Sequence, residues 1–218
     1  AVIIFWIYFS VIALILFILM SVIHFGLCDW SYLGLKKYKW SVSLTHGLNI
    51  VFGIIFFHTN ETFEIFTFLS NLSFNQFQEY LYIVYICYFF LLIRYAYLAI
   101  KFTRLRWGIL EMSIILLVIF LTEPLVAFSI YFCFIHTFKH VKSILKDTSK
   151  YLSNNKFITI TTISFTILTW VGGSLAIIYL HKSFSFDESF IKTLFIGLAA
   201  LTLPHMTLVD IFYRRKFN

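Results

Sequence analysis

Charged residues are scarce in this sequence: Asp, Glu, Lys and Arg make up only 12% of the 218 residues, about half of their share in a soluble domain. Hydrophobic residues make up 61%, and the mean hydropathy is +0.89. So few charges cannot form the polar surface of a water-soluble protein, which excludes an ordinary soluble enzyme, a nucleic-acid reader and a disordered linker. The composition predicts an integral membrane protein.

Cysteine, proline and glycine are also few, at 3, 2 and 8 residues. Cys28, Cys87 and Cys133 are isolated and form no CxxC pair, which argues against a disulfide framework and a thiolate zinc site. Few chain breaks and long unbroken apolar runs favour helices over a β-barrel, whose segments alternate in polarity. The predicted fold class is therefore all-α, a polytopic membrane helical bundle.

About seven segments have the length and apolarity of transmembrane helices. No internal repeat or linker divides the chain, so we predict one integral-membrane domain over 1–218. The sequence begins with Ala1 inside an apolar run and shows no signal-peptide pattern, so we interpret it as lacking the N-terminal part of its parent protein. The predicted segments are 1–27, 41–57, 79–100, 108–122, 124–140, 157–180 and 190–210.

The net charge of +7 follows from basic residues that gather on one side of this topology. If the segments alternate, fourteen Lys and Arg residues lie on one side, and Lys182 and Lys192 lie on the other. The positive-inside rule makes the fourteen-charge side cytoplasmic, so these charges orient the protein and meet anionic lipid, and no nucleic-acid partner is expected. The fourteen are Lys36, Lys37, Lys39, Lys101, Arg104, Arg106, Lys139, Lys142, Lys146, Lys150, Lys156, Arg214, Arg215 and Lys216.

Five of the seven histidines fall near the cytoplasmic ends of predicted helices that are distant in the sequence. Ionisable groups at membrane depth are costly and usually face a bundle interior or a cavity, so this shared depth indicates a functional site. The five are His24, His46, His136, His140 and His205.

His136 and His140 are the most specific pair, because a spacing of four residues puts both rings on one helix face, where they can share a metal. All-imidazole sites suit iron, zinc, copper or nickel. Asp29, Asp210 and Glu111 lie on the same side and could accept the second imidazole N–H of a ligand. For Asp29 and Asp210 a simpler alternative stays open, namely residues at helix ends level with the lipid head groups.

Three sequence blocks together resemble the Brp/Blh family of membrane β-carotene 15,15'-dioxygenases, and in particular the bacterial Blh proteins found alongside proteorhodopsin. The blocks are HFGLCDW at 24–30, EPLVAFSIYFCFIHTFKH at 123–140 and TLFIGLAALTLPHMTLVDIFYR at 193–214. They occur in the family's order and span nearly the whole chain.

The resemblance implies a non-haem Fe(II) enzyme of the inner (cytoplasmic) membrane, with its metal site towards the cytoplasm, that cleaves the central double bond of β-carotene with O2 into two retinal molecules. A retinal-binding rhodopsin is the implied downstream recipient. The iron ligands implied at matching positions are His24, His136 and His140. The family's remaining ligand lies in an upstream GxPHGxxD motif, which would precede Ala1. His205, in LPHM, matches another family motif and is expected to line the site or to substitute for a ligand. His46, at the same predicted depth, is also expected to line the site.

Alternatives from other classes fit the residues less well. A histidine-containing membrane transporter or channel would carry polar residues along several helices, whereas these histidines lie near one end. A b-type haem needs ligands that face each other, and His136 and His140 share one helix face. Membrane di-iron enzymes use about eight histidines in HxxHH clusters, which this sequence lacks.

Overall fold

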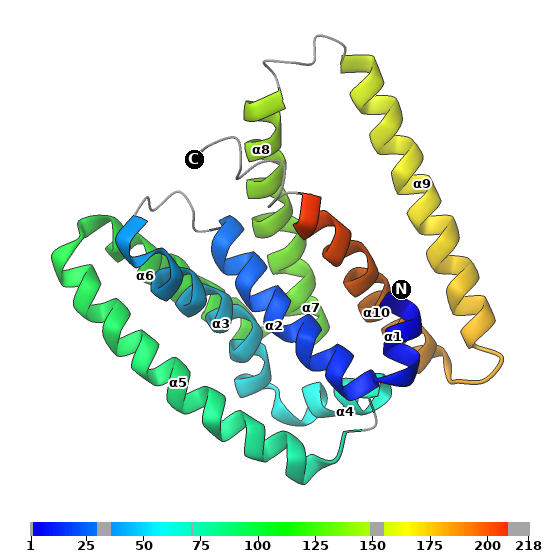
Figure 1. Cartoon of the computed structure of the whole chain (residues 1–218), viewed down its shortest axis with the longest axis horizontal. Coiled ribbons are helices and arrows are strands. Elements are labelled where there is room, and N and C mark those ends of the chain that lie inside the picture. The colour runs from blue at the N-terminus through cyan, green and yellow to red at the C-terminus, as the bar shows by residue number, and fades with distance from the viewer. Residues whose placement is uncertain (1, 30–35, 71, 149–154, 209–218) are drawn as a thin grey trace. The chain divides into compact units, whose positions relative to one another are not determined.

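The computed structural model describes residues 2–29, 36–70, 72–148 and 155–208, and its course is shown in Figure 1. Within these ranges every regular element is a helix and there is no strand. The predicted all-α class is confirmed.

The helices follow the predicted segments closely but divide some of them. Predicted segment 1–27 is two helices, which meet at Phe9. Predicted segment 124–140 begins at Pro124, at the first helical position after Glu123, where a proline costs no backbone hydrogen bond. The elements are α1 (Val2–Tyr8), α2 (Ser10–Asp29), η2 (Lys36–Tyr38), α3 (Lys39–Phe57), α4 (Thr59–Ser70), α5 (Phe74–Lys101), α6 (Thr103–Leu121), α7 (Pro124–Ile130), the π-helix η3 (Tyr131–His136), α8 (Thr137–Thr148), α9 (Asn155–Leu180) and α10 (Phe186–Leu208).

Six helices in the described ranges are long and apolar enough to cross a membrane, which supports a polytopic membrane protein. The one predicted segment without a counterpart among these six, 108–122, corresponds to α6. That helix is 19 residues long but carries Arg104, Arg106 and Glu111, and it is not among the six. The helix α4 occupies part of the connection between two predicted segments, and its 12 residues are too few to span a bilayer. The spanning stretches are Ser10–Asp29, Lys39–Phe57, Asn75–Lys101, Pro124–Lys142, Thr159–Leu180 and Phe186–Met206.

The chain divides into two compact units. One unit contains α1, the start of α2, the end of α4, the end of α8, α9 and α10. In it, α10 packs against both α9 and α1. The buried Trp6 ring donates a hydrogen bond from Nε1 to the carbonyl oxygen of Leu69 (3.0 Å), which ties α1 to the end of α4.

The other unit contains the rest of α2, α3, most of α4, α5 to α7, η3 and most of α8. Its central helix is α3, which packs against α5, α6 and α7. The buried face of α3 carries polar side chains as well as Ile50. Some of these polar side chains form hydrogen bonds with neighbouring helices. Asn49 accepts a hydrogen bond from the Tyr88 hydroxyl (2.7 Å) and donates one to the carbonyl oxygen of Met112 (3.4 Å). Such interhelical hydrogen bonds link membrane helices where the hydrophobic effect does not.

Two glycines let α2 and α3 approach until their backbones touch. A β-carbon added at Gly26 would lie 2.0 Å from the carbonyl oxygen of Ser43, and one added at Gly47 would lie 1.9 Å from that of Val22. Val22 and Gly26 are four residues apart, as are Ser43 and Gly47, so each helix presents one turn to the other. Small residues at such contacts are what allow close packing of membrane helices.

We predict that Gly47→Ala separates α2 from α3 and lowers the free energy of unfolding by about 1–3 kcal/mol, because the obstructing atom is backbone and cannot rotate away. The matched control is Gly172→Ala in α9, where an added β-carbon meets nothing within 4 Å. Thermal unfolding in detergent measures both variants. Equal melting temperatures for Gly47→Ala and the unmodified chain would contradict the close contact.

Candidate metal centre

Three histidine rings from three elements gather in the unit built around α3. They are His24 on α2, His136 at the end of η3 and His140 on α8. The ring centroids are 5.1 Å apart for His24 and His136, 5.8 Å for His136 and His140, and 6.5 Å for His24 and His140. The side chains of His24 and His136 are buried. The structure therefore brings together the three residues predicted as metal ligands.

A π-helical segment sets the direction of His136. Helices α7, η3 and α8 run on as one continuous helix (Figure 1), with η3 as its wider middle part. Both the backbone N–H and the hydroxyl of Thr137 bond to the carbonyl oxygen of Phe132, five residues back. Residues five apart in an α-helix point about 140° away from each other, but the i→i+5 bonding of a π-helix stacks them on one face. Tyr131 and His136 therefore point the same way.

Asp29, the last residue of α2, accepts hydrogen bonds from both Tyr131 and His136. The Tyr131 hydroxyl donates a hydrogen bond to Oδ2 of Asp29. Nδ1 of His136 lies 3.0 Å from Oδ1 and 3.2 Å from Oδ2. A carboxylate can only accept, so Nδ1 of His136 carries the proton, and Nε2 is the nitrogen with which this ring would bind a metal. Asp29 thus bonds to one of the three histidines predicted as ligands, and its role in orienting a metal ligand stays a prediction.

His24 has a similar local partner. Its Nδ1 lies 3.5 Å from the Cys28 thiol, four residues along α2 and so on the same helix face. With Nδ1 directed at the thiol, Nε2 is the nitrogen with which His24 too would bind a metal. From the sequence, Cys28 stood out only as an isolated cysteine outside any CxxC pair.

Aromatic rings hold His136 from two sides. Phe25, on the turn of α2 that carries His24, packs edge-on against His136 at 5.0 Å and against Tyr131 at 5.3 Å between centroids. Phe132 stacks on His136 at 5.4 Å with the ring planes 27° apart. This packing restricts the rotation of the imidazole and keeps it from water.

Glu111, another predicted site residue, forms an ion pair with Lys139, which lies between the two histidines of the HTFKH motif. Both side chains are partly buried. Nζ of Lys139 also donates a hydrogen bond to the backbone carbonyl of Asp29 (3.3 Å). Lys139 therefore links α6 and α8 to the C-terminal end of α2, where a cation is favoured by the helix dipole. From the sequence, Lys139 was predicted only as one of the orienting charges.

The donor chemistry of this cluster fits a metal ion. It offers three imidazoles, one of them held by a buried carboxylate in the arrangement common behind metal-binding histidines. Imidazoles bound to one metal at about 2.1 Å place their ring centroids about 4.5–5.5 Å apart. The pair of His24 and His136 has this spacing, while His140 stands farther away. The types of donor therefore suit a metal, but the spacing of His140 does not: with the side chains in their present positions, no three His, Cys, Asp or Glu residues of the described ranges are close enough to hold one ion.

The remaining predicted site residues are His46, His205 and Asp210. His46 is fully buried in α3, with Nε2 3.0 Å from the Tyr95 hydroxyl, which donates in turn to the carbonyl oxygen of Leu105 (3.2 Å). This places His46 in the packing of α3 with α5 and α6. His205 lies in the last turn of α10, in the other unit, so its role in the site stays a prediction. Asp210 lies outside the described residues.

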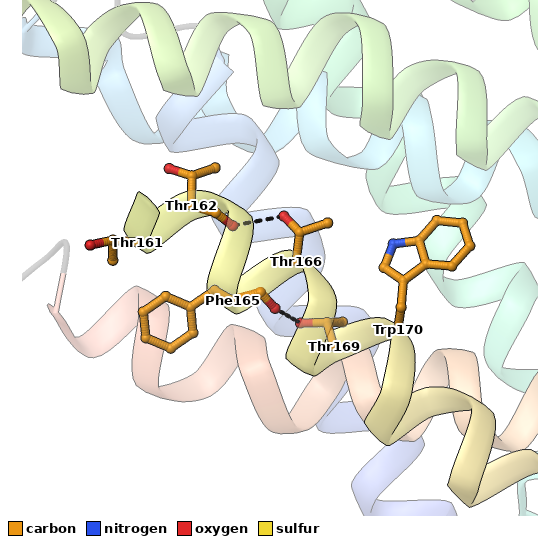
Figure 2. A pocket seen from close by; sticks show the side chains of 6 residues that line it. All are labelled: Thr161, Thr162, Phe165, Thr166, Thr169 and Trp170. Atoms are coloured by element: carbon orange, nitrogen blue, oxygen red, sulfur yellow. Dashed lines mark hydrogen bonds between the residues drawn. The ribbon is translucent and has the colours of Figure 1, made fainter. Parts of the chain in front are cut away.

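An open groove of about 470 Å³ lies along α9 (Figure 2). The hydroxyls of Thr166 and Thr169 bond to carbonyl oxygens one turn back on their own helix, so they are not directed to a ligand. None of the predicted site residues lines this groove. Its lining is Thr161, Thr162, Phe165, Thr166, Thr169 and Trp170.

Sequence reasoning missed Tyr131 and Phe25 as neighbours of the cluster. Tyr131 lies five residues before His136, a spacing that an α-helix would direct to a different face, so the motif YFCFIH gave no sign of it. Phe25 follows His24 directly, and only the packing of α2 against η3 reveals its contact with His136.

Comparison with known proteins decides the family. The sequence model described as beta-carotene 15,15'-dioxygenase matches residues 1–213. The chain belongs to the β-carotene 15,15'-dioxygenase family. The protein named beta-carotene 15,15'-dioxygenase from uncultured marine bacterium 66A03 is 29% identical over 209 residues, which cover 96% of this chain and 75% of that protein. No solved structure matches the chain. The resemblance found in the sequence motifs is thereby confirmed at the level of the family.

We predict that Phe25→Ala destabilises the protein by about 3–5 kcal/mol, because it leaves a cavity beside His136 and Tyr131. The matched control is Phe134→Ala, because Phe134 belongs to η3 but is 74% exposed. Thermal unfolding in detergent compares the two. Similar melting temperatures for the two variants would contradict the packing role of Phe25.

Proposed function

We propose that this chain is a non-haem Fe(II) oxygenase that cleaves the central double bond of β-carotene with O2 and releases two retinal molecules. The observation that carries the proposal is the gathering of His24, His136 and His140, with Asp29 bonded to His136, in a chain whose family is named for this reaction. No solved relative supplies the ligand geometry, so the metal assignment rests on the donor set.

His24, His136 and His140 would hold the iron through neutral imidazoles. When bound, Fe(II) would supply a redox-active centre with open coordination positions, which O2 chemistry requires. The protein's own contribution is to orient the ligands: Asp29 keeps the proton of His136 on Nδ1, and Phe25 and Phe132 hold the plane of its ring. No acid, base or nucleophile of the chain is needed beyond this.

The substrate class agrees with a membrane location of the protein. β-Carotene is a hydrocarbon without a polar group, so shape and apolar contact must position it, and it already resides in the bilayer. The described residues contain six helices apolar enough to cross a membrane, so such a substrate would enter sideways from the lipid. Retinal would leave through the lipid bilayer as well. The recipient that we propose is a retinal-binding rhodopsin in the same membrane.

The location that we propose is the inner (cytoplasmic) membrane, with the histidine cluster towards the cytoplasm. The proposal rests on the predicted alternation of seven segments, with 108–122 in α6 as one of them, which puts most basic residues in the connections and tail on one side. Lys139, next to His136 and His140, belongs to that basic side.

We predict that β-carotene-producing bacteria turn pale and accumulate retinal when they express the reading frame of this chain with any upstream codons retained. His136→Ala should leave the cells orange, because it removes both a metal ligand and the partner of Asp29. The matched control is His181→Ala, since His181 is exposed in the turn before α10 and lies in the other unit. Chromatography of the cell extract measures retinal, and the relative from bacterium 66A03 serves as the positive control.

Retinal production by His136→Ala at the unmodified rate would refute the metal assignment. Orange cells without retinal for the unmodified chain, with insertion into the membrane confirmed, would refute the proposed activity.

We predict that Glu111→Gln lowers retinal formation several-fold without abolishing it, because the charge partner of Lys139 is lost while all three histidines remain. Glu188→Gln is the matched control. It removes an equivalent ion pair, to Lys192 within α10, in the other unit. Equal retinal yields for the two variants would show that Glu111 has no part in the site.

A further inference from the structure

We propose that Tyr131 is a positioning residue of the metal centre: its hydroxyl holds the Asp29 carboxylate in the orientation that fixes the tautomer and direction of His136. The inference rests on the proposed function, because it concerns the same metal site. It extends that function to a residue that contacts neither metal nor substrate in the proposal.

The Asp29 carboxylate and both of its partners are buried. Asp29 and Tyr131 are each 2% exposed, and His136 is 5% exposed. A carboxylate this far from water must have its oxygens satisfied by protein donors, since an unsatisfied one costs several kcal/mol. Tyr131 supplies one of these donors and His136 the other.

The two donors lie closest to different oxygens of the carboxylate. The Tyr131 hydroxyl bonds to Oδ2, and Nδ1 of His136 lies closer to Oδ1 than to Oδ2. Because the hydroxyl occupies Oδ2, the carboxylate cannot rotate freely about its last bond. Oδ1 is therefore held in place for His136.

The π-helix makes the two contacts depend on each other. Tyr131 and His136 are the first and last residues of η3, and the i→i+5 bonding stacks them on one face. Tyr131 thus holds Asp29 at a fixed position relative to the turn that carries His136. A shift of α2 against this helix would break both contacts together.

The direction of His136 follows from these contacts. Because Asp29, held by Tyr131, accepts a hydrogen bond from Nδ1 of His136, Nε2 is the nitrogen that would bind a metal.

The experiment is a double-mutant cycle on metal affinity, with Co(II) as an optical probe added to the metal-free protein in detergent. The variants are Tyr131→Phe, Asp29→Asn and the double variant. Tyr131→Phe is expected to weaken Co(II) binding about 10-fold, the lower end for a residue behind a metal ligand. In the Asp29→Asn background the same change should have no further effect, because Tyr131 acts through Asp29. Tyr97→Phe, at a tyrosine that is 66% exposed, is the matched control.

Two outcomes of the cycle would overturn the inference. One is unchanged Co(II) affinity in Tyr131→Phe. The other is an equal loss of affinity in both backgrounds, which is what a general weakening of the fold by Tyr131→Phe would produce.

A second measurement needs no metal. The nitrogen NMR shifts of the histidines in the metal-free protein, with the His136 signals assigned by their loss in His136→Gln, report which ring nitrogen of His136 carries the proton. The inference requires the proton on Nδ1 in the unmodified protein and a loss of that preference in Tyr131→Phe. A proton on Nε2 alone in the unmodified protein, or an unchanged Nδ1 preference in Tyr131→Phe, would overturn it. If the unmodified protein binds no Co(II), the metal site of the proposed function fails, and these shifts then decide the role of Tyr131.

Discussion

The hydrogen bonds to one buried carboxylate organise the candidate site. Asp29 ends α2 inside the protein, and it is accommodated there because Tyr131 and His136 both bond to it. A buried charge is tolerated only when such partners are in place. The requirement fixes α2 against the π-helix, brings His24 beside His136, and directs the imidazole of His136 towards the other two rings.

The close approach of α2 and α3 provides the support for this arrangement. Gly26 and Gly47 let the two backbones touch within two residues of His24 and His46. Helix α3 in turn is held to α5 and α6 by polar contacts such as that of Asn49 with Tyr88. In a membrane, where apolar faces gain little by meeting each other, small residues and buried hydrogen bonds determine which helix faces pair. The site is therefore built on contacts that a hydrophobicity pattern does not report.

Much of the fold followed from the sequence because a bilayer restricts the choices. Backbone groups in lipid must be bonded within the segment, so long apolar runs become helices of predictable length. The predicted start at Pro124 agrees with α7, and the predicted segment 157–180 agrees with α9 to within two residues. The break at Phe9 and the short helix α4 were not predicted, since neither alters the apolar pattern on which the assignment rests.

The sequence by itself determined the all-α membrane class, the pairing of His136 and His140 on one helix, and the family, whose motifs include the residues around His24. These depend on local spacing and composition. Only the tertiary structure decided that Asp29 rather than Glu111 bonds to His136, that Glu111 pairs with Lys139, and that Tyr131 belongs to the site. The physical reason is that a π-helical turn changes which residues share a face, and contacts between distant helices depend on packing that no local pattern encodes.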